Sequence, residues 1–298
     1  PGVLHCKLYH LNESLPLSDV IPVLENLGLR VLGEFPFRVV QADGTQFWFH
    51  DFEFTFGAGA SLDIQETNAL FRDAFAAVWS GQAENDAFNR LVLLAGLPWR
   101  DVALLRAYAR YLKQIRLGFE LPYIASTLVA HADIARELVR LFRTRFYLAR
   151  KLSADDLADM QGKLEKAILG ALDDVAVLNE DRILRRYLDL IKATLRTNFY
   201  QNDDEGEARE YLSLKFDPTQ IPELPLPRPM FEIFVYSPRV EGVHLRGGMV
   251  ARGGLRWSDR REDFRTEVLG LMKAQMVKNA VIVPVGAKGG FVVKKRVP

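Results

Sequence analysis

The chain of 298 residues has almost no cysteine, no excess of charge of either sign and no long apolar run. Its single cysteine, Cys6, excludes an intramolecular disulfide framework and is typical of a reducing compartment. The net charge of +1 provides no overall field that would favour nucleic acid or a membrane surface. No apolar stretch approaches the roughly 18–20 residues of a membrane span, and no signal peptide is visible. We therefore expect a cytoplasmic protein with neither nucleic acid nor a membrane as partner.

The rest of the composition is typical of a globular chain with several domains. Hydrophobic residues make up 49% and charged residues 26%, and the length is sufficient for two or three domains with separate cores. The chain has no initiator methionine and stops directly after a strand-like segment, so we expect a piece of a longer protein. We expect an α+β fold, with a strand-rich module over 1–58, a helical region over 59–216, a linker over 217–230 and a β-rich unit over 231–298.

Residues 1–58 predict the order strand, helix, strand, strand. The apolar residues of 19–27 recur on one face, which predicts a short helix. Within 47–56 the aromatic residues change from one face of a strand to the other, which indicates a bulge near His50 or burial on both faces. This β-α-β-β order resembles half of an ACT-type regulatory domain. The resemblance implies either a role in assembly and packing or the binding of an amino-acid effector.

The histidines of this module have spacings that match no metal-binding pattern. We expect His5, His10 and His50 to be exposed or bonded to protein partners, and we expect no metal site.

The helical region shows apolar residues at repeated 3–4 spacing and no recognisable catalytic constellation. Arg136, Arg140 and Arg143 fall on one helix face. This face suits either phosphate or nucleic-acid binding, or solvation and salt bridging. The glycine and aromatic pattern of a nucleic-acid module does not accompany it, so we favour the second interpretation.

Residues 217–230 carry five prolines, which cannot continue a helix and favour extended backbone. This segment is the best candidate for a domain boundary.

Two glycine-flanked cationic elements follow it. In Arg252-Gly253-Gly254-Leu255-Arg256, the glycines allow backbone N–H groups to approach an anion and the arginines are suited to binding a carboxylate. The alternative is a plain glycine turn with surface arginines.

A helix over 261–278 is predicted next, with Ser258 or Asp259 as its cap. One face of this helix carries apolar residues and then two polar ones, in the order Phe264, Val268, Leu271, Gln275 and Lys278. A sheltered lysine requires a partner, so an acidic ligand suits this face. The alternative is a lysine that extends to solvent at the helix end.

After this helix, the sequence predicts a buried strand over 280–285 and a glycine-rich loop over 284–290. Three glycines surround Lys288 in this loop, which suits either a site lysine or a flexible surface turn. The spacing does not match a phosphate-binding GxxxxGK[ST] loop, and no GxGxxG dinucleotide fingerprint occurs.

These residues, as an ordered set, resemble the glutamate dehydrogenase family. Its substrate domain carries a [KR]GG[LI]R element, a helix ending in lysine, an apolar strand and a GGxKGG-like segment. The sequence RGGLRWSDRREDFRTEVLGLMKAQMVKNAVIVPVGAKGG is similar to the corresponding segment of the large, multidomain, NAD-specific bacterial branch of that family. That branch has a long N-terminal extension with ACT-like modules, which accommodates residues 1–216.

The resemblance implies a role for each matching residue. Arg252, within an RGG motif that includes Gly253 and Gly254, matches the position that holds the side-chain carboxylate of glutamate or 2-oxoglutarate. Gln275 and Lys278 match the positions that bind the α-carboxylate. Lys288 matches the catalytic lysine, which activates water and polarises the substrate carbonyl.

The resemblance further implies that NAD is the cofactor and that its domain lies outside this chain. We expect a homo-oligomeric parent enzyme that converts L-glutamate, NAD and water to 2-oxoglutarate, ammonia and NADH. We expect the fragment alone to be inactive. The alternative is a regulatory or oligomerisation module that binds an amino-acid effector.

Overall fold

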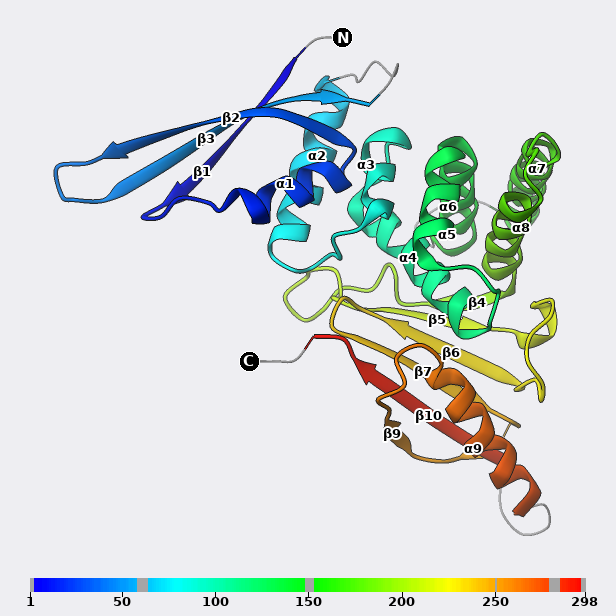
Figure 1. Cartoon of the computed structure of the whole chain (residues 1–298). Coiled ribbons are helices and arrows are strands. Elements are labelled where there is room, and N and C mark those ends of the chain that lie inside the picture. Colours follow the sequence, from blue (N-terminus) through cyan, green and yellow to red (C-terminus); the bar gives the residue numbers. More distant parts are fainter. Residues whose placement is uncertain (1–2, 58–63, 148–152, 250, 279–284, 296–298) are drawn as a thin grey trace. The chain divides into compact units, whose positions relative to one another are not determined.

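The computed structural model describes residues 3–57, 64–147, 153–249, 251–278 and 285–295 (Figure 1). The chain forms two compact units, residues 1–102 and residues 103–298. The predicted α+β class is confirmed, because both helices and sheets are present in the order expected from the sequence. No helix in the described ranges is long and apolar enough to cross a membrane.

The first unit begins with the predicted β-α-β-β order. Its elements are β1 (Leu4–Leu11), α1 (Leu17–Asn26), β2 (Leu29–Val40) and β3 (Gln46–Phe56), followed by α2 (Ile64–Trp79), the 3-10 turn η1 (Ala87–Arg90) and α3 (Leu91–Leu94). The sheet is antiparallel with the order β1-β3-β2, and α1 packs against β2. Burial of an apolar helix face against a sheet is the expected source of stability for such a unit.

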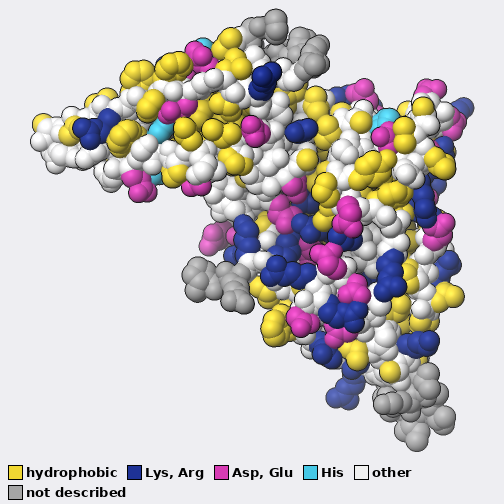
Figure 2. All heavy atoms as spheres, viewed as in Figure 1, with side chains coloured by type: hydrophobic (Ala, Val, Ile, Leu, Met, Phe, Trp, Pro, Cys, Tyr) yellow, Lys and Arg dark blue, Asp and Glu magenta, His cyan; other side chains and the backbone are white. Residues whose placement is uncertain are grey.

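The aromatic residues of β3 change faces without a bulge in that strand. Its register with β1 is continuous, and the irregularity lies in β2 between Val31 and Gly33. Phe52 and Phe54 are buried, whereas Phe49 on the other face is half-buried beside exposed Phe37. The predicted bulge near His50 is therefore wrong. The second interpretation, burial on both faces, holds in part, because the face with Phe52 and Phe54 is buried and the face with Phe49 is half-buried. On the surface shown in Figure 2, hydrophobic side chains are numerous over the first unit.

The histidines of the first unit have protein partners, as expected. His50 is buried, with Nδ1 2.7 Å from a carboxylate oxygen of Glu34, and its Nε2 accepts the Leu15 N–H. His5 lies 3.2 Å from the Asp51 carboxylate. Within the described residues no group of three His, Cys, Asp or Glu side chains could hold a metal ion.

Among the described residues, five helices precede the sheet of the second unit. They are α4 (Trp99–Gln114, whose first turn belongs to the first unit), α5 (Leu121–Ala130), α6 (Ala132–Phe146), α7 (Ala154–Asp173) and α8 (Leu178–Ala193). Ser153 caps α7 as its sequence position suggests, with Oγ accepting the Asp156 N–H at 3.1 Å. The apolar residues that recur along α4 are buried. The prediction of helices is therefore confirmed as far as Ala193.

Beyond Ala193 the helical prediction is wrong, because two strands already belong to the sheet. Its elements are β4 (Thr194–Thr197), β5 (Leu212–Phe216), the 3-10 turn η2 (Pro218–Gln220), β6 (Phe231–Tyr236), β7 (Val240–Arg246), β8 (Ala251–Arg252), β9 (Leu255–Trp257), α9 (Phe264–Lys278) and β10 (Val285–Val293). Among these, the order is β4-β5-β6-β7-β10-β8, with β9 also paired to β10. The proline-rich segment connects β5 to its neighbour β6, so it is a connection within one sheet.

Helix α4 packs on this sheet through aromatic side chains. The Tyr111 ring stacks on Phe216 with centroids 4.4 Å apart, and it lies 5.5 Å from the Phe234 ring. Such aromatic pairs contribute roughly 0.5–1.5 kcal/mol each beyond the burial of their area. The sheet that carries the site residues is thereby held against the helical region.

Candidate active site

The segment around Lys288 is a strand, which corrects the predicted glycine loop. Residues 286–290 lie within β10, where Lys288 is the antiparallel partner of Leu245 on β7. The predicted strand over 280–285 falls largely outside the described residues, which resume at Val285. Pairing on both edges of β10 overrides the low strand propensity of its glycines.

The two glycine-flanked cationic elements run side by side. Strands β8 and β9 pair with β10 in parallel, so that Arg252 is opposite Gly286 and Arg256 is opposite Gly290. A Cβ at Gly253 would lie 1.4 Å from the carbonyl oxygen of Ala287, so only glycine fits at that point. The Gly289 N–H donates to the Gly254 carbonyl at 3.1 Å, so this N–H is used within the sheet. An anion bound at this place would therefore be held by cationic side chains.

Helix α9 covers β10 with a face that differs from the predicted one. Phe264, Arg265, Val268, Leu269 and Met272 are buried, whereas Leu271 is half-exposed. The buried face of α9 is therefore rotated toward Arg265 relative to the face that the apolar residues alone predict. The reason is that Arg265 is buried as half of an ion pair, a position that a hydrophobic pattern does not count.

Glycines allow α9 to lie close to β10. A Cβ at Gly290 would be 2.5 Å from Cγ2 of Val268, and a Cβ at Gly286 would be 3.1 Å from the side chain of Gln275. Side chains alternate along a strand, so Lys288 shares the α9-facing side of β10 with Gly286 and Gly290. Lys288 is half-exposed, consistent with a position at the margin of the covering helix.

Gln275 is oriented by the arginine–glycine element. Its Nε2 donates to the carbonyl oxygen of Arg252 at 2.8 Å, whereas its Oε1 is buried and has no hydrogen-bond partner in the described part of the chain. The structure thus brings Gln275, the Arg252 backbone and Gly286 together, with Lys288 two residues farther along β10. The Arg252 side chain is exposed. Lys278 is the last residue of α9, and its side chain lies outside the described residues.

The predicted cap of α9 is wrong. The helix begins at Phe264, later than expected, and the Ser258 hydroxyl instead accepts the Arg260 N–H and donates to the Glu267 carboxylate at 2.6 Å. The acceptor for the Arg265 N–H is Oε1 of Gln114, which comes from α4. A contact over 151 residues leaves no local signal in the sequence.

Two further titratable groups near the site escaped the sequence reasoning. Glu232 binds Arg265 with both side chains fully buried, and its only sequence signal is a charge in the buried phase of a strand. His244 is the partner of Gly289 across β7 and β10. Its partial burial and the nearby Arg246 lower the pKa of His244 below its usual value.

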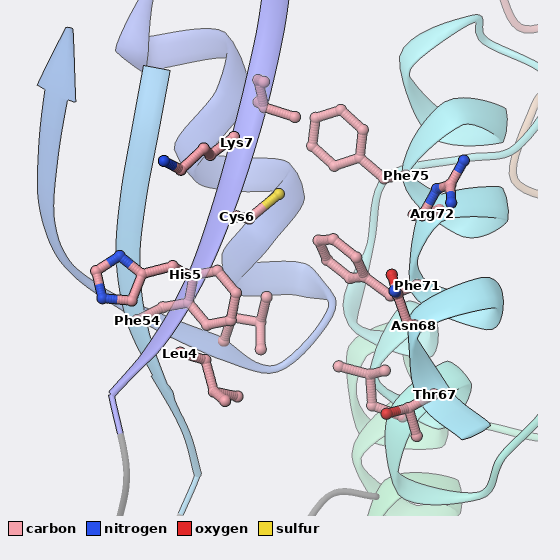
Figure 3. Close-up of a pocket in the computed structure, with 13 residues that line it drawn as sticks. Leu4, His5, Cys6, Lys7, Phe54, Thr67, Asn68, Phe71, Arg72 and Phe75 are labelled. Carbon is pink, nitrogen blue, oxygen red and sulfur yellow. The ribbon is translucent and has the colours of Figure 1, made fainter. Parts of the chain in front are cut away.

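A separate pocket of about 450 Å³ lies in the first unit between β1 and α2 (Figure 3). Cys6, Phe71 and Phe75 point into it, while His5 and Lys7 point away. Burial, with a further contribution from the Asp51 charge, raises the pKa of the Cys6 thiol to about 11. The cavity is mainly apolar with Asn68, Thr67 and Arg72 at α2, so it suits a small, largely apolar molecule.

Fold and site together define a multidomain α+β chain whose last part is a cation-bearing sheet covered by one helix. Three family models match it in sequence order: "Glutamate dehydrogenase, ACT3 domain" over residues 1–67, "Glutamate dehydrogenase, helical motif 3" over 83–148, and "Bacterial NAD-glutamate dehydrogenase, catalytic domain" over 167–298.

Curated relatives agree with these models. The chain is 75% identical over 292 residues to an NAD-specific glutamate dehydrogenase of Pseudomonas aeruginosa, and 57% identical to one of Halomonas elongata, covering 98% of this chain in both. It is 50% identical over 300 residues to the NAD-specific glutamate dehydrogenase of Mycobacterium tuberculosis, over 99% of this chain. The chain spans 18% of the length of each of these relatives. It therefore belongs to the large NAD-specific glutamate dehydrogenase family, as a segment of such a protein.

Proposed function

We propose that the full-length parent of this chain oxidises L-glutamate to 2-oxoglutarate and ammonia with NAD as hydride acceptor. The observation that carries the proposal is the parallel pairing of the Arg252 and Lys288 segments on one sheet, with Gln275 of α9 beside them. This arrangement concentrates cationic and amide groups at one place, which suits a dicarboxylate. Membership of the family supports the reaction assigned to it.

We propose a role for each site residue in that reaction. Arg252, on the β8 strand that leads into Gly253 and Gly254, binds the side-chain carboxylate through its exposed guanidinium. Gln275 and Lys278 bind the α-carboxylate from α9. Once hydride has left the α-carbon and the substrate is an iminium, Lys288 activates the water that attacks the iminium carbon, and it polarises the carbonyl that forms as ammonia departs.

NAD is the hydride acceptor of the reaction. We propose that the residues that hold NAD lie in the part of the parent outside this chain. The sequence of this chain contains no GxGxxG fingerprint, which agrees with that division. The 298 residues alone are accordingly expected to be inactive. We also propose the division into an ACT-like module over 1–58, a helical region and a catalytic part, and a homo-oligomeric, cytoplasmic parent.

The proposed function is tested with the purified full-length parent. Glutamate-dependent formation of NADH at 340 nm, with 2-oxoglutarate and ammonia in equal amounts, is the expected result. Absence of glutamate-dependent NADH from a folded, NAD-binding parent would refute the proposed reaction.

A second function is favoured by the pocket of the first unit. We propose that the ACT-like module binds an amino-acid effector with an apolar side chain, because the cavity between β1 and α2 is lined mainly by apolar groups. Calorimetry of the full-length parent with a panel of amino acids tests this proposal. Cys6→Trp fills the cavity and is expected to abolish effector binding, whereas Lys288→Ala is expected to retain it.

The nucleic-acid interpretation of the helical region has less support. Arg136 pairs with Asp133 at 2.8 Å and Arg140 pairs with Glu137 at 3.5 Å, which supports the salt-bridged interpretation for these two arginines. On the surface shown in Figure 2, basic and acidic side chains are interspersed over the second unit. Such a surface lacks the single-sign footprint that nucleic-acid binding requires.

A further inference from the structure

The carboxyl end of α4 contacts the start of α9 through a buried side chain, Gln114, beside the more exposed ion pair of Lys113 with Glu262 at 2.6 Å. Its Nε2 donates to the carbonyl oxygens of Arg261 and Glu262 at 3.1 and 3.2 Å, and its Oε1 accepts the Arg265 N–H at 3.1 Å. Gln114 is only 3% exposed, so water cannot readily replace these bonds. One amide group therefore binds three backbone groups of the turn that opens α9.

This contact serves as a helix cap supplied from another helix. The first N–H groups of a helix have no partner within it, and a local Ser, Thr, Asp or Asn side chain usually satisfies one of them. Here the oxygen that satisfies the Arg265 N–H comes from Gln114 on α4. The position of α9 along its axis is thus set by the helical region.

A second anchor sets the rotation of α9 about its axis. Nε and Nη2 of Arg265 bind the two carboxylate oxygens of Glu232 on β6, at 2.5 and 2.7 Å. A helix rises about 1.5 Å and turns about 100° per residue, so fixing Arg265 determines where Gln275 lies, roughly 15 Å farther along. Gln275 lies where its side chain contacts Gly286 and the Arg252 carbonyl.

We propose that Gln114 is a positioning residue for the substrate site, which holds α9 so that Gln275 meets the Arg252 and Lys288 strands. The proposal rests on the proposed function. It joins the segment that matches the helical motif to the segment that matches the catalytic domain. Gln114 acts through α9 and does not touch the substrate.

The test compares variants of the full-length parent. Gln114→Met keeps the size of the side chain and removes all three bonds, whereas Gln114→Glu keeps the acceptor for the Arg265 N–H and removes the donor. Lys192→Met is the matched control, because it breaks an ion pair with Glu165 on helices away from α9. Glutamate KM, kcat, NAD KM and amide hydrogen exchange of the peptide 262–270 are measured for each.

Gln114→Met is expected to raise the glutamate KM about tenfold with kcat within threefold and NAD KM unchanged, since a small displacement of binding groups weakens substrate binding. Amide exchange of 262–270 is expected to increase about tenfold. Gln114→Glu is expected to be at least as impaired as Gln114→Met, because its buried carboxylate would face the carbonyl oxygens of Arg261 and Glu262, and Lys192→Met is expected to match the wild type.

Two results would overturn the proposal. One is unchanged exchange over 262–270 in Gln114→Met, which would show that α9 does not depend on this residue. The other is faster exchange with an unchanged glutamate KM, which would show that the site does not depend on the position of α9. Amide exchange is measured without substrate, so it does not depend on the proposed reaction. A parent that does not oxidise glutamate would refute the proposed function. The exchange result would then still decide whether Gln114 holds α9.

Discussion

The guanidinium of Arg265 binds both carboxylate oxygens of Glu232, and the two side chains are fully buried between α9 and the sheet. Burial alone would lower the pKa of Arg265, but the facing carboxylate more than offsets this and keeps that pKa above its usual value. Tyr111 of α4 is also buried, and its burial together with the Glu232 charge raises the pKa of Tyr111 well above the usual value. The Arg265 guanidinium therefore stays protonated throughout the accessible pH range.

We predict that Arg265→Met destabilises the chain by about 3–5 kcal/mol, because Glu232 is then left as an unpaired buried charge. The double variant Arg265→Met with Glu232→Leu is expected to recover most of this loss. Urea unfolding followed by tryptophan fluorescence measures both. Equal loss in the single and the double variant would contradict the prediction.

Gly290→Ala and Gly270→Ala are expected to have opposite effects on the free energy of unfolding. A Cβ at Gly290 would approach Val268 Cγ2 to 2.5 Å, and displacing α9 costs about 1–3 kcal/mol. Gly270 is exposed on α9 with no atom within 4 Å of its Cβ position, so alanine there gains up to about 1 kcal/mol of helix propensity. Thermal unfolding of the two variants is the measurement, and equal shifts would contradict close packing of α9 on β10.

The pH dependence of stability is expected to include a contribution from His244. Its pKa is lowered in the folded chain, so the unfolded chain binds the proton more readily. The stabilisation is present above the usual histidine pKa of about 6.5 and is lost as the pH falls through the lower, folded value. Unfolding midpoints at pH 7.5 and 5.5 should therefore differ less in His244→Asn than in the wild type, and an equal difference would rule out this contribution.

Lys288→Ala is expected to lower kcat of the full-length parent by at least about a hundredfold, since a positioned proton-transfer group contributes that much or more. The half-exposed side chain is not part of the core, so the unfolding temperature should remain within about 2 °C. Steady-state kinetics and calorimetry check the two parts. Turnover close to that of the wild type would contradict the catalytic role.

Arg252→Ala is expected to raise the glutamate KM about ten- to a hundredfold, because a charge-assisted bond to the substrate carboxylate is lost. Arg256→Ala is the comparison, since Arg256 is already engaged with Glu267 at 3.0 Å and should affect KM less. Initial-rate measurements over a range of glutamate concentrations distinguish them. An unaltered KM in Arg252→Ala would remove its substrate role.

Local patterns predicted the elements that depend on neighbours in the sequence. The β-α-β-β order and the helices as far as Ala193 follow from short-range periodicity within a few residues. The same reasoning failed for the segment around Lys288. Glycines there indicate a turn, and only pairing with β7 on one side and with β8 and β9 on the other makes it a strand.

The two glycine-flanked cationic elements, 252–256 and 284–290, have a different physical role from the one the sequence suggested. The glycines at 253, 286 and 290 allow backbone and helix to pack closely, whereas the sequence alone suggested contacts to an anion. The residues Arg252, Gln275, Lys278 and Lys288 remain the proposed site. The groups proposed to position α9 are less visible in the sequence, because Gln114 lies 151 residues and Glu232 lies 33 residues from their shared partner Arg265.

By itself the sequence determined the family resemblance, the order of modules and the identity of the proposed site residues, because these depend on motifs and short-range spacing. The tertiary structure decided that β8, β9 and β10 are neighbours, which face of α9 is buried and which distant residue caps it. Those outcomes depend on pairing and packing between segments up to 151 residues apart. Such contacts stabilise the chain only after it has folded and brought these segments together.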